Sequence, residues 1–144
     1  MIDLFSRRIV GYEMENHQRT SLPLAALKNA INSRTPSSGL IHHSDRGSQY
    51  LSEEYLQTLE KHQFKSSLNM AGTCLDNAVV ESFFSSLKQE CVYRHSFKSR
   101  AEAKEYIIDY IENFYNSKRQ HSANQGLSPM EFEHRFHCKN LQNH

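Results

Sequence analysis

Short extended segments alternate with helical ones along most of this chain, and this order limits the fold more than any other feature. Residues 9–14 roughly alternate apolar and polar side chains, as a half-buried strand does. A turn near Ser6 and Arg7 joins them to an earlier extended segment, and residues 39–43 and 64–68 are predicted as two further short strands. Strands separated by helices favour an α/β layer fold over a helical bundle.

Two helices are predicted between these strands. The first is capped by Thr20 or Ser21, has Pro23 in its first turn and ends before Pro36. Its apolar residues at helical spacing are Leu24, Leu27 and Ile31. The second helix opens at Ser52, which is followed by two glutamates that complement the helix dipole. Its predicted buried face consists of Tyr55, Leu56 and Leu59.

The second half of the chain predicts two clearer helices, after a loop over residues 69–76. One spans about residues 77–93, and its apolar stripe consists of Val80, Phe83, Phe84, Leu87 and Cys91. The other begins at Ser99, which together with Glu102 has the S-x-x-E form of a capping box. Its predicted core face consists of Ile107, Tyr110, Ile111 and Phe114. The remainder is polar and irregular until residues 130–136.

Composition is that of a soluble globular protein of about one domain. The chain has 144 residues, of which 38% are hydrophobic and 23% charged. No apolar run approaches the roughly 20 residues of a membrane helix, and the amino terminus lacks the pattern of a signal peptide. Three cysteines without a CxxC pair suit a reducing cytoplasm and give no disulfide framework. The net charge of +1 neither supports nor excludes DNA as a partner.

Two carboxylates occupy positions where a site could form. Asp45 follows a predicted strand, where ligands usually bind in α/β sheets, and Gly47 permits close backbone approach. Glu81 lies early in a predicted helix, on a polar face that it shares with Ser85 and Lys88. Each has an ordinary alternative explanation. An aspartate after a strand is most often a turn residue or a cap, and a glutamate early in a helix usually complements the helix dipole.

The spacing of these residues matches a known pattern. Residues 46–80, 35 in number, separate Asp45 from Glu81, and Lys88 follows Glu81 by seven. Four segments carry the pattern, in the order IDLFSRRIVGY, HHSDRGSQY, LDNAVVESFFSSLKQE and FYNSKRQHSANQGLSPMEFE. They extend over residues 2–136, nearly the whole chain. On these segments and this spacing, the chain resembles bacterial insertion-sequence DDE transposases with a retroviral-integrase-like catalytic core.

The resemblance implies an RNase H-like, three-layer α/β fold and metal-dependent DNA cleavage and strand transfer. In that family three carboxylates hold two Mg²⁺ or Mn²⁺ ions, hard cations that prefer oxygen ligands. The two metals would activate a water or a DNA 3′-hydroxyl and stabilise the leaving oxygen. By motif match, Asp45 is the second carboxylate and Glu81 the third. Lys88 would contact a DNA phosphate near the scissile end.

Other polar residues have weaker predictions. Asn77, next to Asp76, could help to position DNA, although a helix N-cap is the more common role for such residues. Arg119 in the closing motif could contact DNA phosphate or fix the tail of the chain to the core. His42 and His43 do not predict a zinc site, because adjacent strand residues point to opposite faces and no partner cysteines follow.

The resemblance also implies that one part of the core is missing. In the family the first catalytic aspartate comes from a central strand upstream of the segment that matches IDLFSRRIVGY, and Asp3 belongs to the following strand. We therefore expect a truncated core over residues 1–136, lacking its first, central strand, and a disordered tail over residues 137–144. The expected partners are DNA, as transposon ends and target, and another copy or an intact transposase, with no membrane. The expected location is the bacterial cytoplasm, on the nucleoid when bound to DNA.

Different functions follow from these expectations. The first is a transposase fragment that is inactive alone, since only two of three catalytic carboxylates are present. The alternative is a non-catalytic DNA-binding or dimerisation module that modulates an intact transposase. They differ in metal dependence, because only the first should lose activity on losing Asp45 or Glu81. A different RNase H-like nuclease fits the closing segment and the DNAVVESFF segment less well.

Overall fold

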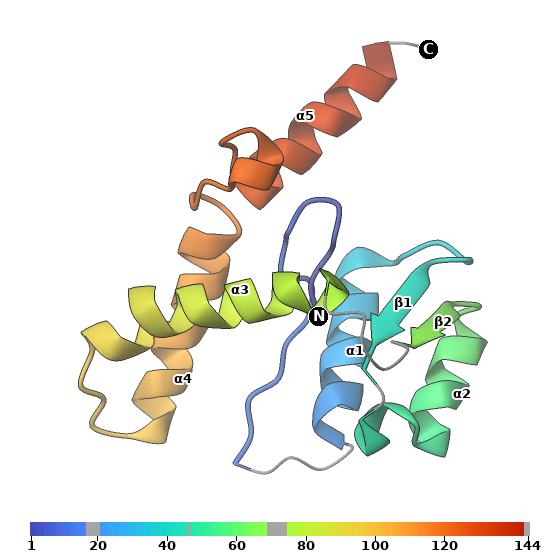
Figure 1. The fold of residues 1–144 in the computed structure, drawn as a ribbon, viewed down its shortest axis with the longest axis horizontal. Helices are drawn as coiled ribbons and strands as arrows, with labels where there is room; N and C mark the ends of the chain where they lie inside the picture. The colour runs from blue at the N-terminus through green and yellow to red at the C-terminus, as the bar shows by residue number, and fades with distance from the viewer. Residues whose placement is uncertain (17–20, 46, 69–74, 143–144) are drawn as a thin grey trace. The chain divides into compact units, whose positions relative to one another are not determined.

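The computed structural model describes residues 1–16, 21–45, 47–68 and 75–142. Its helices and strands follow in the order α1 (Ser21–Arg34), β1 (Ile41–Ser44), α2 (Glu53–Lys61), β2 (Lys65–Leu68), α3 (Leu75–Glu90), α4 (Arg100–Asp109) and α5 (Pro129–Gln142) (Figure 1). Short 3₁₀ turns lie at Ser48–Tyr50, Val92–Arg94 and Ser122–Asn124, and a π-helical turn at Tyr110–Tyr115. The residues group into two compact units, the first of residues 1 and 10–78 and the second of residues 2–9 and 79–144.

The first unit is a small α/β layer, consistent with the predicted fold class. Strands β1 and β2 run parallel, with Ile41 opposite Lys65 and Ser44 opposite Leu68. Helices α1 and α2 lie beside the strands (Figure 1). The core of this unit consists of Leu24, Leu27, Ile31, Tyr55, Leu59 and Phe64. A parallel pair needs such a crossover helix between its strands, and α2 provides it.

Helix α2 begins as predicted, but one predicted core residue is exposed. The side chain of Ser52 accepts a hydrogen bond from the backbone N–H of Tyr55 at 3.4 Å, as an N-cap does. Tyr55 is fully buried and Leu59 nearly so, whereas Leu56 is 40% exposed. The prediction for Leu56 was therefore wrong, because this short helix buries only a narrow stripe.

The predicted strand over residues 9–14 does not form. Its described pairing consists of one bridge between Ile9 and Ile2, a hydrogen bond from the N–H of Val10 to the carbonyl of Met1 at 3.1 Å, and one from the amino terminus of Met1 to the carbonyl of Gly11. Further along, Ser33 of α1 donates to the carbonyl oxygen of Val10 at 2.8 Å, and Asn29 donates to that of Tyr12 at 3.1 Å. Side chains of a helix thus satisfy backbone groups that the prediction assigned to a neighbouring strand.

The core of the second unit is aromatic. Helix α3 contributes Phe83 and Leu87 to this core, and Cys91 follows directly after the helix. The π-helical turn contributes Tyr110, Ile111 and Tyr115. The rings of Phe83 and Tyr115 meet edge to face, with centroids 5.0 Å apart. Val80 and Phe84, predicted for the same stripe, are 38% and 50% exposed. The apolar stripe of α3 is therefore wider than the surface that this core covers.

The π-helical turn changes which aromatic residue is buried. The backbone N–H of Asn116 donates to the carbonyl of Ile111, five residues earlier, at 2.9 Å. Each such turn takes up one more residue than an α-helical turn. A period of 3.6 residues predicted Phe114 for the core, but Phe114 is 41% exposed and Tyr115 only 3%. The prediction was wrong because no local pattern of residues indicates this change in register.

The amino-terminal turn is held against the closing segment by buried polar groups. The side-chain amide of Asn116 accepts from the N–H of Ile9 at 2.9 Å and donates to its carbonyl at 3.0 Å. Asn124, fully buried, donates to the carbonyl of Ser6 at 2.6 Å. The hydroxyl of Ser6 donates to the carboxylate of Glu133 in α5 at 2.8 Å. These bonds join residues more than a hundred positions apart in the sequence.

The carboxy-terminal part also differs from the prediction. Helix α5 continues to Gln142, so residues 137–142 are helical where a disordered tail was expected, and residues 143–144 lie outside the described part. The predicted domain over residues 1–136 stays a prediction. Among the described residues, no helix is long and apolar enough to span a membrane.

The buried hydrogen bonds of the Asn116 amide lead to a prediction about the free energy of unfolding. Replacing Asn116 with alanine leaves the buried N–H and C=O of Ile9 without partners, and we expect a loss of roughly 2–4 kcal/mol in the free energy of unfolding. Urea denaturation followed by circular dichroism measures it. The matched control is Asn113→Ala, because Asn113 is exposed and bonds only Asp109, so a change within about 0.5 kcal/mol is expected. Equal effects for both variants would contradict this role.

Candidate functional site

Asp45 lies just after β1, at the carboxyl end of the parallel pair. Its side chain is exposed, and its Oδ1 accepts a hydrogen bond from the backbone N–H of Gly47 at 2.8 Å. This is the aspartate turn that the sequence left open as the ordinary explanation. A Cβ on Gly47 would lie 2.9 Å from Asp45 Oδ1, so a glycine suits this close approach. The second carboxylate oxygen, Oδ2, accepts no hydrogen bond from any described group.

The strand that positions Asp45 is fixed by two histidines. The Nε2 of His42 bonds the hydroxyl of Tyr55 at 2.9 Å, and the Nδ1 of His43 bonds the hydroxyl of Ser67 across the sheet at 3.1 Å. Burial lowers the pKa of His42, which favours its neutral form at neutral pH. The pKa of Tyr50 is raised by burial and, second, by the negative charge of Asp45. The histidines therefore have structural partners on two different elements.

Glu81 and Lys88 line one shallow groove in the second unit. The groove has a volume of about 440 Å³ and is lined by Glu81, Phe84, Ser85, Lys88, Gln89 and Tyr93. The carboxylate of Glu81 is exposed and has no hydrogen bond or ion pair within the described ranges. The same holds for the ammonium group of Lys88. The polar face predicted for Glu81, Ser85 and Lys88 is thus present as one concave surface.

Sequence reasoning missed the aromatic part of this groove. Phe84 was assigned to the core, and Tyr93 was treated only as the end of the predicted helix. Tyr93 lies in the 3₁₀ turn after α3, where a helical wheel for α3 no longer applies. Its position three residues beyond the last residue of α3 could have suggested an exposed ring.

Asn77 lies in the first turn of α3, which begins at Leu75. The predicted N-cap role is therefore wrong for both Asp76 and Asn77, because they lie inside the helix. The N-cap position before Leu75 is outside the described residues, as are the side chains of Asp76 and Asn77. The DNA contact of Asn77 stays a prediction.

Arg119 joins the closing segment to α3. Its Nε and Nη2 both donate to the carboxylate of Glu90, at 2.9 and 2.7 Å, and Nη2 also donates to Ser86 at 3.1 Å. The hydroxyl of Tyr110 donates to the same carboxylate at 2.7 Å. The hydrogen bond from Arg119 is the main reason why the pKa of Glu90 is lowered. Arg119 thus fixes the tail to the core, one of its two expected roles, and its phosphate contact stays a prediction.

Asp45 and Glu81 have the chemistry that hard divalent cations require. Both are exposed carboxylates with at least one oxygen that accepts no hydrogen bond from a described group. Mg²⁺ and Mn²⁺ are bound by such oxygens. The two residues belong to different units, and within the described ranges no three His, Cys, Asp or Glu side chains gather in a metal-binding group. Each carboxylate, taken by itself, has the oxygen chemistry of a ligand for such an ion.

Comparison with known proteins identifies the family of this chain. Family models of the integrase core domain match residues 1–74 and 81–142. The transposase for insertion sequence element IS904 of Lactococcus lactis is 42% identical over 132 residues, which is 92% of this chain and 52% of the relative. Transposase InsF for insertion sequence IS3A of Escherichia coli K12 is 42% identical over 135 residues, 94% of this chain and 47% of the relative.

A third relative, the insertion element IS600 uncharacterized 31 kDa protein of Shigella sonnei, is also 42% identical, over 94% of this chain and 50% of its own length. The chain spans about half the length of the curated relatives it matches. The chain belongs to the integrase core domain family and is similar to transposases of insertion sequences. The resemblance predicted from the sequence segments is therefore confirmed.

The Glu90–Arg119 pair predicts a pH dependence of stability. Because the pKa of folded Glu90 is lowered, its contribution is present above the ordinary glutamate value of about 4.3 and is lost as the pH falls through the lowered value. Urea denaturation of the parent chain and of Glu90→Gln at pH 6 and pH 3 should show a large difference in stability at pH 6 and a small one at pH 3. Glu105→Gln, which removes an exposed glutamate of α4, is the control and should show little difference at either pH. A Glu90 effect that is equal at both pH values would contradict the assignment.

Proposed function

We propose that this chain forms part of a transposase catalytic core that carries out metal-dependent DNA cleavage and strand transfer. The observation that carries the proposal is the groove on α3, where the carboxylate of Glu81 and the ammonium group of Lys88, neither paired with any described residue, lie on one surface. A metal ligand next to a phosphate-binding cation is the combination that phosphodiester chemistry needs. The match to integrase core models over both halves of the chain supports it.

In this proposal Asp45 and Glu81 act as ligands of Mg²⁺ or Mn²⁺. Two such ions, when bound, supply an activated oxygen nucleophile and stabilise the leaving oxygen. Lys88 contacts a DNA phosphate through its charge, which orients the strand along α3. The Arg119–Glu90 pair keeps α3 in place and thereby positions Glu81, and the contact of Arg119 with DNA phosphate stays part of the proposal.

The first carboxylate of the family pattern and the central strand that carries it come, in our proposal, from outside these 144 residues. No residue here matches the first aspartate of the pattern, and two carboxylates are too few to hold a metal pair. The curated relatives are about twice as long as the matched stretch. We therefore infer that the 144 residues alone do not cleave DNA, and that their partners are DNA and a polypeptide that supplies the missing ligand.

A chimera tests the catalytic assignment. In the Lactococcus lactis IS904 transposase, the segment that matches this chain is replaced by residues 1–144, and transposition of a marked element is counted in cells. We expect the chimera to be active and both Asp45→Asn and Glu81→Gln to lower transposition at least about 100-fold, since removal of a metal ligand removes the charge that binds the ions. Glu53→Gln, an exposed glutamate at the start of α2, is the matched control and should retain activity.

Two outcomes would contradict the proposal. An active chimera that is insensitive to both Asp45→Asn and Glu81→Gln would favour the alternative, a DNA-binding or dimerisation module without catalysis. Metal-dependent DNA cleavage by the 144-residue chain alone would contradict the inference that it is inactive by itself.

A further inference from the structure

We propose that the groove on α3 also binds an unpaired DNA base and that Tyr93 stacks on this base. The inference rests on the proposed DNA function and adds a positioning residue to it. It places the single-stranded end of the DNA along α3, with its backbone beside Lys88 and a base against the aromatic side chains at the far end of the groove.

The exposed ring of Tyr93 is the first reason for this inference. Its side chain is 73% exposed, and it makes no hydrogen bond or ring contact within the described ranges. Nearby aromatic residues in the sequence do have packing partners: the ring of Tyr106 packs against those of His95 and Phe97, with centroids 4.7 and 5.7 Å away. An exposed aromatic ring without a packing role is a candidate for recognition.

The composition of the groove is the second reason. Phe84, which is 50% exposed, and Tyr93 line it together with the unpaired Lys88. Proteins that bind single-stranded nucleic acid combine cations that follow the backbone with aromatic rings that stack on bases. A base within a duplex has both faces covered by its neighbours, so a ring can stack only on a base that is unpaired.

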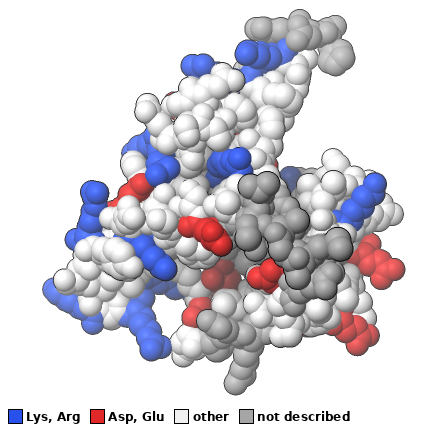
Figure 2. All heavy atoms as spheres, in the orientation of Figure 1, with Lys and Arg blue, Asp and Glu red and all other residues white. Residues whose placement is uncertain are grey.

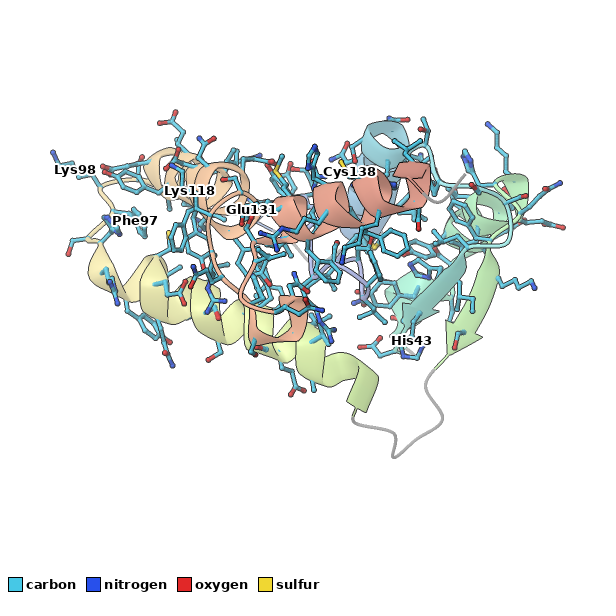
Figure 3. All side chains as sticks on the ribbon, turned by 90° about the horizontal axis from the view of Figure 1, so that it is seen from above. His43, Phe97, Lys98, Lys118, Glu131 and Cys138 are labelled. Atoms are coloured by element: carbon cyan, nitrogen blue, oxygen red, sulfur yellow. The ribbon has the colours of Figure 1, made fainter. Side chains whose placement is uncertain are left out.

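The charge around the groove is the third reason. Between residues 88 and 104 the chain has five Lys or Arg residues and two glutamates. One of these glutamates, Glu90, is neutralised by Arg119. The basic side chains gather around the turn between α3 and α4, where Phe97 and Lys98 lie (Figures 2 and 3). Although the net charge of the chain is only +1, this local surface is positively charged and complementary to DNA phosphate.

Helix geometry sets the register of the bound strand. Lys88 lies seven residues after Glu81, or about 10 Å along α3, which corresponds to roughly three nucleotides of one strand. Tyr93 lies a few ångströms beyond the end of α3. We therefore expect it to stack on a base roughly five to six nucleotides from the phosphate that Glu81 and its metal would contact.

Fluorescence of 2-aminopurine tests this assignment. The probe is a DNA duplex with a single-stranded end that carries 2-aminopurine at each of these positions in turn, titrated with the 144-residue chain without divalent metal. Stacking on Tyr93 should quench the fluorescence at one or two neighbouring positions. Tyr93→Ala should abolish the quenching and weaken binding of this probe roughly 5- to 100-fold. Tyr93→Phe, the matched control, keeps the ring and should retain both.

Lys88→Gln separates the stacking contact from DNA binding in general. It should weaken binding of the overhang probe and of blunt duplex alike and reduce the slope of log affinity against log salt by about one. Lys118→Gln, at an exposed lysine of the closing segment, is its control. Circular dichroism spectra of all variants should match the parent, because each change is on an exposed side chain.

The outcomes distinguish this inference from the proposed function. If the chain binds DNA and responds to Lys88→Gln, but Tyr93→Ala changes neither quenching nor affinity, the stacking inference is overturned and the proposed function stands. If the chain binds neither probe at low salt, both are overturned. Concentration-dependent self-association that Tyr93→Ala abolishes, without quenching of any probe, would identify a second copy as the occupant and also overturn the inference.

Discussion

The structure of the second unit depends on the pair of hydrogen bonds between the side-chain amide of Asn116 and the backbone of Ile9. This amide pairs with both the N–H and the C=O of Ile9, as a neighbouring strand would, and it is almost completely buried. The π-helical turn before it sets the direction of this side chain, because a hydrogen bond from its N–H to Ile111 adds one residue to the turn. This local change in helical register therefore allows the closing segment to contact the amino-terminal turn.

The same closing segment controls α3. Three residues after Asn116, Arg119 binds Glu90 at the last turn of α3, while Tyr115 packs edge to face on Phe83. These contacts fix one side of the helix by ion pairing and aromatic packing. The other side, with Glu81, Ser85 and Lys88, is left exposed as a groove. A buried network thus specifies which face of the helix is available for chemistry.

Much of this could be predicted from the sequence because the signals are local. The Ser52 and Ser99 caps and both strands depend on nearby residues, and they formed within two residues of the predicted positions. The signature segments around Asp45 and Glu81, together with the spacing of these two residues, identified the family without any structure. The roles of Asn116 and Glu90 could not be predicted, since each depends on a partner brought near by folding. The exposed Phe84 was missed because periodicity identifies apolar residues but not how far a core extends.

We propose that Asp45 and Glu81 are ligands of the same metal pair in the assembled core. Fe²⁺ that replaces Mg²⁺ and reacts with added hydrogen peroxide generates hydroxyl radicals that cut the polypeptide near the ligands, so mass spectrometry of the fragments from the IS904 chimera tests this proposal directly. We expect cuts close to both residue 45 and residue 81 that excess Mg²⁺ suppresses and that Asp45→Asn removes at both positions. Cuts near only one of them, or cuts near residue 81 that persist in Asp45→Asn, would contradict a shared site.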